Sequence, residues 1–362
     1  MKLAPLALAF AAFTFTAPAL AQDDLSQKRD GNVVARAASP DGRITVTVSI
    51  DGEGRASYAV QRAGKPLLTD SRLGFLFTDA PKLDRNLALV EVKRDKADTS
   101  WTQPFGEWTT IRDNHNEMTV RLREKADLAR EMDVTFRIFD DGIGFRYSYA
   151  GIPDGRQVSV MADRTQFRTK GAYQAWWYQG LGQERDEYLY TQTDARRITL
   201  AETPLTLKGD NGLYLSFHEA ALVGYSGMWF KRADGQLFRS TLAPSSRGAR
   251  VIRDLPFNTP WRTIRVADNA AGLVENDLEL NLNEPNKIGD VSWFKPMKYI
   301  GIWWGMIRGD WTWAEGPRHG ATTERTKQYI DFAAKNGFGG VLVEGWDKGW
   351  NGEWLGRGQD FS

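Results

Sequence analysis

Alternation of apolar and polar residues, repeated from about Gly31 to Glu284, is the feature that most restricts the fold of this chain. In RITVTVSID (Arg43–Asp51), an apolar side chain occupies every second position, with threonine or serine between. Successive side chains of a strand point to opposite faces, so this period of two predicts a strand with one buried face. A DGEG break follows, and ASYAVQR is expected to pair back as a hairpin.

A second hairpin is predicted in VTFRIFDDGIGFRYSYA (Val134–Ala150), with Asp141-Gly142 supplying the positive φ angles of a tight turn. Short strands are expected to recur through Val251, Leu280 and Leu282, without a helix longer than two turns. The natural outcome of this pattern is a large antiparallel β-sandwich.

The pattern changes after NEPNKIGDVSWFKPMK (residues 283–298). YIGIWWG (Tyr299–Gly305) is a nearly continuous apolar run, which predicts a strand covered on both faces. TTERTKQYIDFAAKNG predicts a helix that is capped by Thr322 or Thr323 and ends at Gly337. GGVLVEGW then reads as a second buried strand, so we expect a βαβ unit with parallel strands and a right-handed crossover.

The ends of these two strands are where a site is expected. In parallel α/β folds, the loops that leave the carboxyl ends of the strands converge on one face and supply the working residues. Glu344 closes the second predicted strand, and Trp303 and Trp304 close the first. The alternative for Glu344 is a salt-bridged structural residue, and for Trp304 it is packing under neighbouring helices.

Composition limits the compartment and the partners. Lys2 precedes an apolar run from Leu3 to Phe15, and Ala19-Leu20-Ala21 suits a signal peptidase, so residues 1–21 are predicted to be a signal peptide cleaved before Gln22. The chain has no cysteine despite predicted export, which favours a periplasmic or secreted protein stabilised by its core. A net charge of +1 without a basic stripe makes nucleic acid an unlikely partner, and no membrane span is expected after cleavage.

Several motifs together resemble glycoside hydrolase family 97, closest to its α-glucosidase branch. They are AWWYQG, DEYLYTQT, LSFHEAAL, TPWRTI, FKPMKYIGIWWGM and EGPRHGATTERTKQYIDFAAKNGFGGVLVEGWDKGW. The resemblance implies a galactose-mutarotase-like β-super-sandwich over residues 22–290 and the start of a catalytic (β/α)8 barrel over 291–362. It also implies a Ca²⁺-dependent exo-acting enzyme that releases glucose from α-glucosides such as maltooligosaccharides.

The same resemblance assigns roles to two acids, Glu187 and Glu344, and the pocket that it implies suggests contacts for Trp304, Trp346 and His319. Glu187 matches a glutamate that the N-terminal domain supplies to Ca²⁺, with Glu184 and Asp186 as the alternatives. Glu344 matches a pocket glutamate near the substrate. Trp304 and Trp346 are expected to offer rings to the sugar, with Trp303 and Trp350 as further candidates, and His319 is expected at the pocket rim. His218, beside Glu219, is expected to be structural.

The catalytic acid and base are expected beyond Ser362, because the resemblance places them on later barrel strands. We therefore expect the chain ending there to be inactive alone. A retaining α-galactosidase of the same family is the first alternative function. A non-catalytic carbohydrate-binding module is the second, and the sequence does not address the oligomeric state.

Overall fold

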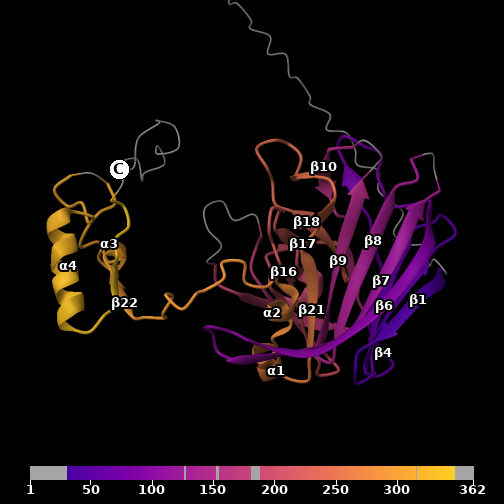
Figure 1. Ribbon diagram of the computed structural model, residues 1–362, viewed down its shortest axis with the longest axis horizontal. Helices are drawn as coiled ribbons and strands as arrows, with labels where there is room; N and C mark the ends of the chain where they lie inside the picture. Colours follow the sequence, from indigo (N-terminus) through magenta and orange to yellow (C-terminus); the bar gives the residue numbers. More distant parts are fainter. Residues whose placement is uncertain (1–30, 126–127, 152–154, 181–187, 315, 347–362) are drawn as a thin grey trace, which may run out of the picture. The chain divides into compact units, whose positions relative to one another are not determined.

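The chain forms two units, shown in Figure 1. The computed structural model describes residues 31–125, 128–151, 155–180, 188–314 and 316–346. One unit, the sandwich unit, comprises Met1–Trp101 and Thr110–Pro285; the other, the βαβ unit, comprises Thr102–Thr109 and Asn286–Ser362. The predicted signal peptide lies outside the described residues. No helix in the described ranges is long and apolar enough to cross a membrane.

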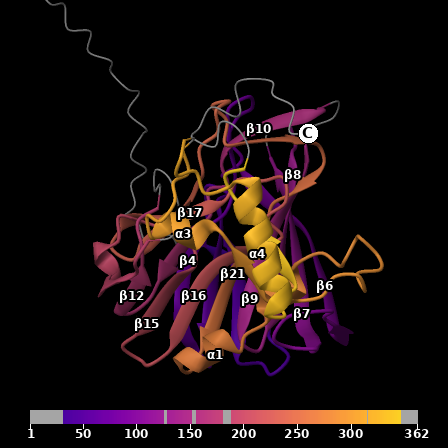
Figure 2. The same ribbon diagram turned by 90° about the vertical axis from the view of Figure 1, so that its left-hand side faces the viewer.

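The sandwich unit contains three antiparallel sheets (Figures 1 and 2). The eight-stranded sheet has the order β1 (Asn32–Ala38), β2 (Ile44–Ile50), β3 (Ala56–Arg62), β4 (Lys65–Arg72), β11 (Gln166–Thr169), β18 (Leu237–Leu242), β17 (Met228–Asp234) and β14 (Leu200–Ala201). The ten-stranded sheet has the order β13 (Thr191–Asp194), β12 (Tyr173–Trp177), β15 (Leu205–Gly209), β16 (Tyr214–Ala220), β21 (Trp261–Ala267), β9 (Gly142–Gly151), β8 (Glu131–Phe139), β7 (Thr110–Glu124) and β6 (Leu87–Thr102), with β20 (Phe257–Asn258) beside β9. A smaller sheet joins β19 (Val251–Asp254), β10 (Gln157–Ala162) and β5 (Leu76–Phe77).

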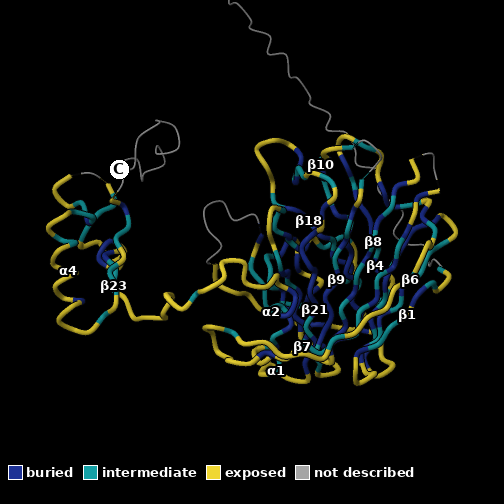
Figure 3. The backbone as a smooth tube through the Cα atoms, in the orientation of Figure 1, coloured by how far each residue is buried: buried dark blue, intermediate teal, exposed yellow. Residues whose placement is uncertain are grey.

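The predicted alternation is confirmed by burial. In β2, Ile44, Val46 and Val48 are fully buried, whereas the threonines between them are half-exposed. β2 pairs with β3 in the expected hairpin, and Figure 3 shows buried stretches running along the strands of this unit. Each fully buried side chain of this size contributes about 1.5–3 kcal/mol to stability relative to exposure, so the alternating residues supply the main driving force for the sandwich.

Two local expectations for this unit are wrong. Asp141 and Gly142 do not have positive φ angles, because β8 and β9 are joined by the two-residue turn Asp140–Asp141 and Gly142 already belongs to β9. Glycine is needed there for space instead: a Cβ atom would lie 2.6 Å from the Ile264 carbonyl oxygen. Leu280 and Leu282 lie in a short helix, α2 (Leu278–Leu282), which follows α1 (Ala270–Val274) and buries Leu278 and Leu282 on the sheet.

A buried arginine connects the two large sheets. Arg262 of β21 forms ion pairs with Asp163 and Glu219, and the Arg262 and Asp163 side chains are completely buried. Glu219 Oε1 also accepts a hydrogen bond from the Met228 backbone N–H (2.8 Å), so this carboxylate of β16 reaches β17 of the other sheet. Burial raises the pKa of Glu219, because removal of water disfavours its charged form. Breaking such a buried network leaves charges without compensation.

The βαβ unit has the predicted connectivity. β22 (Tyr299–Gly301) pairs in parallel with β23 (Gly340–Leu342), and α4 (Thr323–Lys335) lies between them in the chain. Thr322 caps α4 by accepting a hydrogen bond from the Arg325 N–H, and Gly337 follows the helix at φ 73°. The handedness of the crossover stays a prediction.

Burial in this unit differs from the expectation. Tyr299 is 60% exposed and Leu342 is 43% exposed, so these strands are not covered on both faces. Helical spacing predicts that Tyr329, Ile330, Ala333 and Ala334 share one face of α4, yet only Ala333 is buried. The physical reason is that β22 and β23 pair only with each other among the described residues, which leaves both edges of this small sheet open.

Replacing Arg262 with methionine tests the buried network. Methionine resembles the aliphatic stem of arginine but leaves the Asp163 and Glu219 carboxylates without their cation. We therefore expect the R262M variant to lose about 3–5 kcal/mol in unfolding free energy. Urea denaturation gives this value, and the triple variant R262M/D163N/E219Q should recover part of it. R112M removes an exposed arginine and should leave the midpoint nearly unchanged. Equal midpoints for R262M and wild type would contradict a structural role for the network.

Replacing Gly142 with alanine tests the packing at the start of β9. The added Cβ meets the Ile264 carbonyl oxygen and Leu278 Cδ1, so we expect a loss of about 1–3 kcal/mol from overpacking. G52A is the matched control, because a Cβ at Gly52 meets nothing within 4 Å. Denaturation of both variants measures the difference, and a G142A protein as stable as G52A would disprove the steric account.

Candidate functional site

The candidate site lies at the edge of the sheet where β22 and β23 end. Because these strands are parallel, the residues that follow Gly301 and Leu342 emerge at the same edge. After β22 the chain forms a short helix, α3 (Trp303–Ile307), and after β23 it continues through Val343 to Trp346. The edge therefore carries the tryptophans and the glutamate that the sequence singled out.

The position of Trp303 and Trp304 requires a correction. They do not close a strand but form the first turn of α3, because β22 ends at Gly301. Their ring centroids are 5.7 Å apart. Trp304 is 60% exposed and Trp346 59%, so both rings are accessible to a ligand rather than packed in the described part of the unit. An indole offers a flat apolar face together with one N–H donor, which suits a hydroxylated ring.

Glu344 lies two residues after the last residue of β23. Its side chain is half-buried, and it forms no hydrogen bond or ion pair with any residue that the structure describes. The alternative of a salt-bridged glutamate thus finds no partner within these ranges. A carboxylate can accept several hydrogen bonds, and no described residue donates one to Glu344.

His319 lies in the loop between α3 and α4. Its backbone N–H donates to the Gly316 carbonyl (3.0 Å), and the residue forms a parallel bridge with Thr312. Its Nδ1 atom is buried and has no hydrogen-bond partner among the described residues. Among the described residues, His319 forms no hydrogen bond with Trp304, Glu344 or Trp346; it lies in a neighbouring loop, whereas the other three follow the two strands.

Arg325 holds this loop, a role that the sequence did not suggest. Its Nη1 donates to the carbonyl oxygens of His319 (2.7 Å) and Gly320 (3.0 Å). Its guanidinium carbon lies 3.5 Å from the centroid of the Trp311 ring. The only signal in the sequence is an arginine in the first turn of a helix, and its partners become adjacent only when the loop folds back.

The other two histidines are structural. His218 Nδ1 lies 2.5 Å from Thr203 Oγ1, and burial lowers the pKa of His218. His115 is buried on β7, with its Nδ1 2.5 Å from Asp113 Oδ1. These positions agree with the expectation for His218 and give no histidine cluster.

The expected calcium ligand cannot be placed. Glu187, with its alternatives Glu184 and Asp186, falls outside the described residues, as does Trp350. Within the described ranges, no group of three or more histidine or acidic side chains could hold a metal ion. The described residues alone therefore do not form a calcium site, and we derive no chemical step through one.

An antiparallel sandwich followed by a parallel βαβ unit, with indole rings and a carboxylate at the strand edge, defines a multidomain chain with a candidate sugar site. Residues 37–285 match the family model described as glycosyl-hydrolase 97 N-terminal, and residues 303–362 match glycoside hydrolase 97. The chain belongs to glycoside hydrolase family 97.

Solved structures and curated relatives agree with this assignment. The chain is similar to a glycoside hydrolase family 97 enzyme from Pseudoalteromonas sp. strain K8, at 42% identity and a TM-score of 0.84, over 91% of this chain and 50% of that one. Structures of that enzyme include complexes with panose and acarbose. A retaining α-galactosidase from Bacteroides thetaiotaomicron is 25% identical, over 86% of this chain and 50% of the relative. A probable retaining α-galactosidase from Streptomyces bingchenggensis is 28% identical, over 92% and 48%. The chain thus spans about half the length of these proteins.

Replacing Arg325 with alanine tests its hold on the loop. Losing two hydrogen bonds and the contact with Trp311 should lower the free energy of local opening by about 1–3 kcal/mol, which corresponds to roughly 5–150-fold faster exchange. Hydrogen exchange of the Thr312 and Gly320 amides, which close the loop, measures the effect. K327A is the control on the exposed side of the same helix. Unchanged exchange in R325A would show that the loop is held by other contacts.

Proposed function

We propose that this protein is an exo-acting, Ca²⁺-dependent α-glucosidase that releases glucose from α-glucosides such as maltooligosaccharides. The observation that supports this most is the 42% identity, over 91% of the chain, to the Pseudoalteromonas enzyme whose structures contain panose and acarbose. Panose is a trisaccharide of α-linked glucose, and the curated α-galactosidases are more distant at 25% and 28% identity. The sequence of residues 1–21 supports an exported, periplasmic or secreted protein.

In this proposal, the residues at the strand edge bind the terminal sugar of the substrate. Trp304 and Trp346 contact the apolar face of the terminal glucose, and Glu344 accepts hydrogen bonds from its hydroxyl groups. His319 contributes at the rim, and Glu187 contributes one oxygen ligand to Ca²⁺, which takes about six to eight such ligands. Glycosidases need a further pair of carboxyl groups across the scissile bond, and we assign neither to a described residue. We take the sandwich as galactose-mutarotase-like, and the barrel would hold this pair.

A retaining α-galactosidase is the second candidate, favoured by the names of the two curated relatives. The two functions differ at the C4 hydroxyl of the terminal sugar, so paired aryl substrates separate them. The protein produced from its natural reading frame should hydrolyse 4-nitrophenyl α-D-glucoside with a kcat/KM at least 100-fold above that for the α-D-galactoside. That ratio corresponds to about 2.7 kcal/mol of differential transition-state binding.

The opposite preference would establish the α-galactosidase instead. Hydrolysis of neither substrate, together with retained binding of maltotriose, would favour the non-catalytic carbohydrate-binding module. All three outcomes use the same preparation, and the anomer released, followed by NMR, reports inversion or retention.

Removal of calcium tests the cofactor and its ligand. Chelation followed by dialysis should abolish hydrolysis of the preferred substrate, and Ca²⁺ should restore it. E187Q should need at least tenfold more Ca²⁺ for half-maximal activity, because it loses a charged ligand. E184Q and D186N are matched controls from the same segment and should behave as wild type. If E184Q or D186N, and not E187Q, needs more Ca²⁺ for half-maximal activity, then Glu184 or Asp186 is the ligand instead of Glu187.

A further inference from the structure

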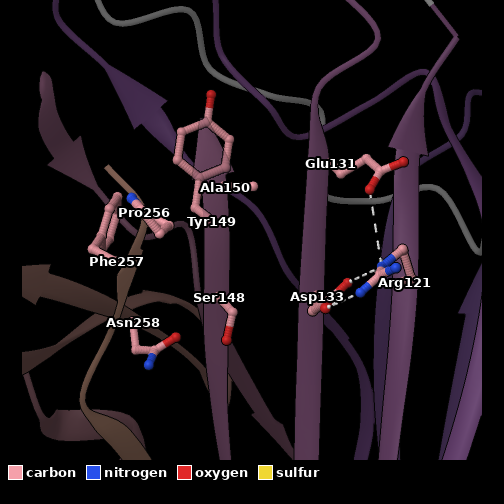
Figure 4. A pocket seen from close by; sticks show the side chains of 9 residues that line it. All are labelled: Arg121, Glu131, Asp133, Ser148, Tyr149, Ala150, Pro256, Phe257 and Asn258. Carbon is pink, nitrogen blue, oxygen red and sulfur yellow. Dashed lines mark hydrogen bonds and ion pairs between the residues drawn. The ribbon is translucent and has the colours of Figure 1, made fainter. Parts of the chain in front are cut away.

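A small pocket lined by both polar and apolar side chains lies on the outer face of the ten-stranded sheet, in the sandwich unit (Figure 4); Tyr149, Ala150 and Phe257 belong to its apolar part. Its volume is about 130 Å³, and its principal side chains are Arg121, Glu131, Asp133, Ser148, Pro256 and Asn258. Asp133 and Ser148 alternate with the buried Val134 and Tyr147, so they point away from the sandwich core. The pocket is thus separate from the apolar interior and belongs to a different unit from the strand edge described above.

Four of these side chains form one row across four strands. Arg121 of β7 is the register partner of Asp133 of β8, Asp133 is the partner of Ser148 of β9, and Ser148 is the partner of Asn258 of β20. Neighbouring strands lie about 4.7–4.9 Å apart, so the row extends over roughly 14 Å. Register fixes these groups on a rigid sheet rather than on a loop, and a rigid row is a suitable frame for recognition.

The row offers hydrogen-bonding groups that the protein does not use. Arg121 donates through Nε and Nη2 to both oxygens of Asp133, at 2.8 and 2.9 Å, which fixes both side chains. The nearest carboxylate to Arg121 Nη1 is Glu91, at 3.9 Å, which is too long for a hydrogen bond. The Ser148 hydroxyl and the Asn258 carboxamide have no hydrogen-bond partner within the described residues. The Ser148 hydroxyl and the Asn258 carboxamide can each donate and accept, so they can pair with hydroxyl groups, which also do both.

Charge and size restrict the ligand further. Asp133 neutralises Arg121, and Glu131 accepts a hydrogen bond from Arg123, so the pocket carries no unpaired charge that would select an ion. No metal-binding group exists in the described ranges. Pockets for drug-sized ligands have volumes of roughly 300–1,000 Å³, so a pocket of about 130 Å³ suits a single small ring rather than a chain. Pro256 supplies an apolar wall for such a ring.

We propose that this pocket binds one neutral pyranose, as a non-catalytic sugar site on the sandwich. Asp133 and Arg121 Nη1 contact adjacent hydroxyl groups at one end of the ring, and Ser148 and Asn258 contact those at the other. The choice of glucose as the probe rests on the proposed function, but the pocket takes no part in hydrolysis. It would hold the released sugar, or a terminal sugar unit of a larger glycan, on the enzyme.

Titration with D-glucose, followed through the backbone amide resonances of Ser148 and Ala150, tests the proposal in solution. Both amides should shift with a single saturable dissociation constant. The S148A/N258A variant, read at the Ala150 amide, should raise that constant at least tenfold, while kcat/KM for the aryl glycoside stays as in wild type. The control N32A/S49A removes the same chemical groups from the eight-stranded sheet and should leave the constant unchanged.

Failure of this proposal and failure of the proposed function give different results. If the amides of residues 148–150 do not shift at glucose concentrations that shift resonances beside Trp304, the pocket is not a sugar site and the glucosidase assignment stands. If they shift in a protein that hydrolyses no α-glucoside, the pocket stands and the assignment fails. If wild type and S148A/N258A have the same dissociation constant for glucose, the proposal that this pocket binds the sugar is wrong.

Discussion

The packing of the sandwich depends on one charged side chain in its interior. Arg262 is fully buried, and its two carboxylate partners come from β16 and from the segment that leads into β11. Glu219 also accepts a hydrogen bond from the Met228 backbone N–H on the opposite sheet. Thr165 follows Asp163 by two residues, and its Oγ1 lies 2.8 Å from the Tyr147 hydroxyl oxygen of β9. Apolar burial is non-directional, whereas hydrogen bonds require a defined geometry. Discrete hydrogen bonds between the sheets select one register, at the cost of desolvating three charges.

The βαβ unit follows a different rule. Its two strands are held by parallel pairing, a capped helix and the loop that Arg325 secures, yet its apolar side chains stay largely exposed. The sandwich is therefore stabilised by its own core. In the βαβ unit, strand pairing and hydrogen bonds fix the backbone, but the side chains are not buried in a core. That difference explains why the strand edge can present Trp304, Glu344 and Trp346 to a ligand. Indole rings and a carboxylate without a partner among the described residues are the groups on which the proposed sugar recognition rests.

Periodicity predicted most of the architecture, because local alternation reports which face of a strand is buried. The hairpins of β2–β3 and β8–β9, the parallel pair and the helix with its Thr322 cap follow from it. Errors arose where tertiary contacts decide. Gly142 was interpreted through its turn, although its neighbour Ile264 is distant in sequence. The apolar spacing of Leu280 and Leu282 is as compatible with one helical turn as with a strand, and an aromatic pair after a short strand gave no sign of α3.

The site was predicted in part for the same reason. The sequence placed Glu344 near the end of the second strand, although pairing ends at Leu342 and Glu344 follows β23 instead of closing it. Arg325 and Arg262 gain their roles only from partners brought together by folding. The most direct test of the account is a crystal structure of the protein with a non-hydrolysable thio-linked maltotriose. The account predicts the terminal glucose against Trp304 or Trp346, with Glu344 within hydrogen-bond distance of a hydroxyl. A bound trisaccharide that touches none of the residues following β22 and β23 would contradict it.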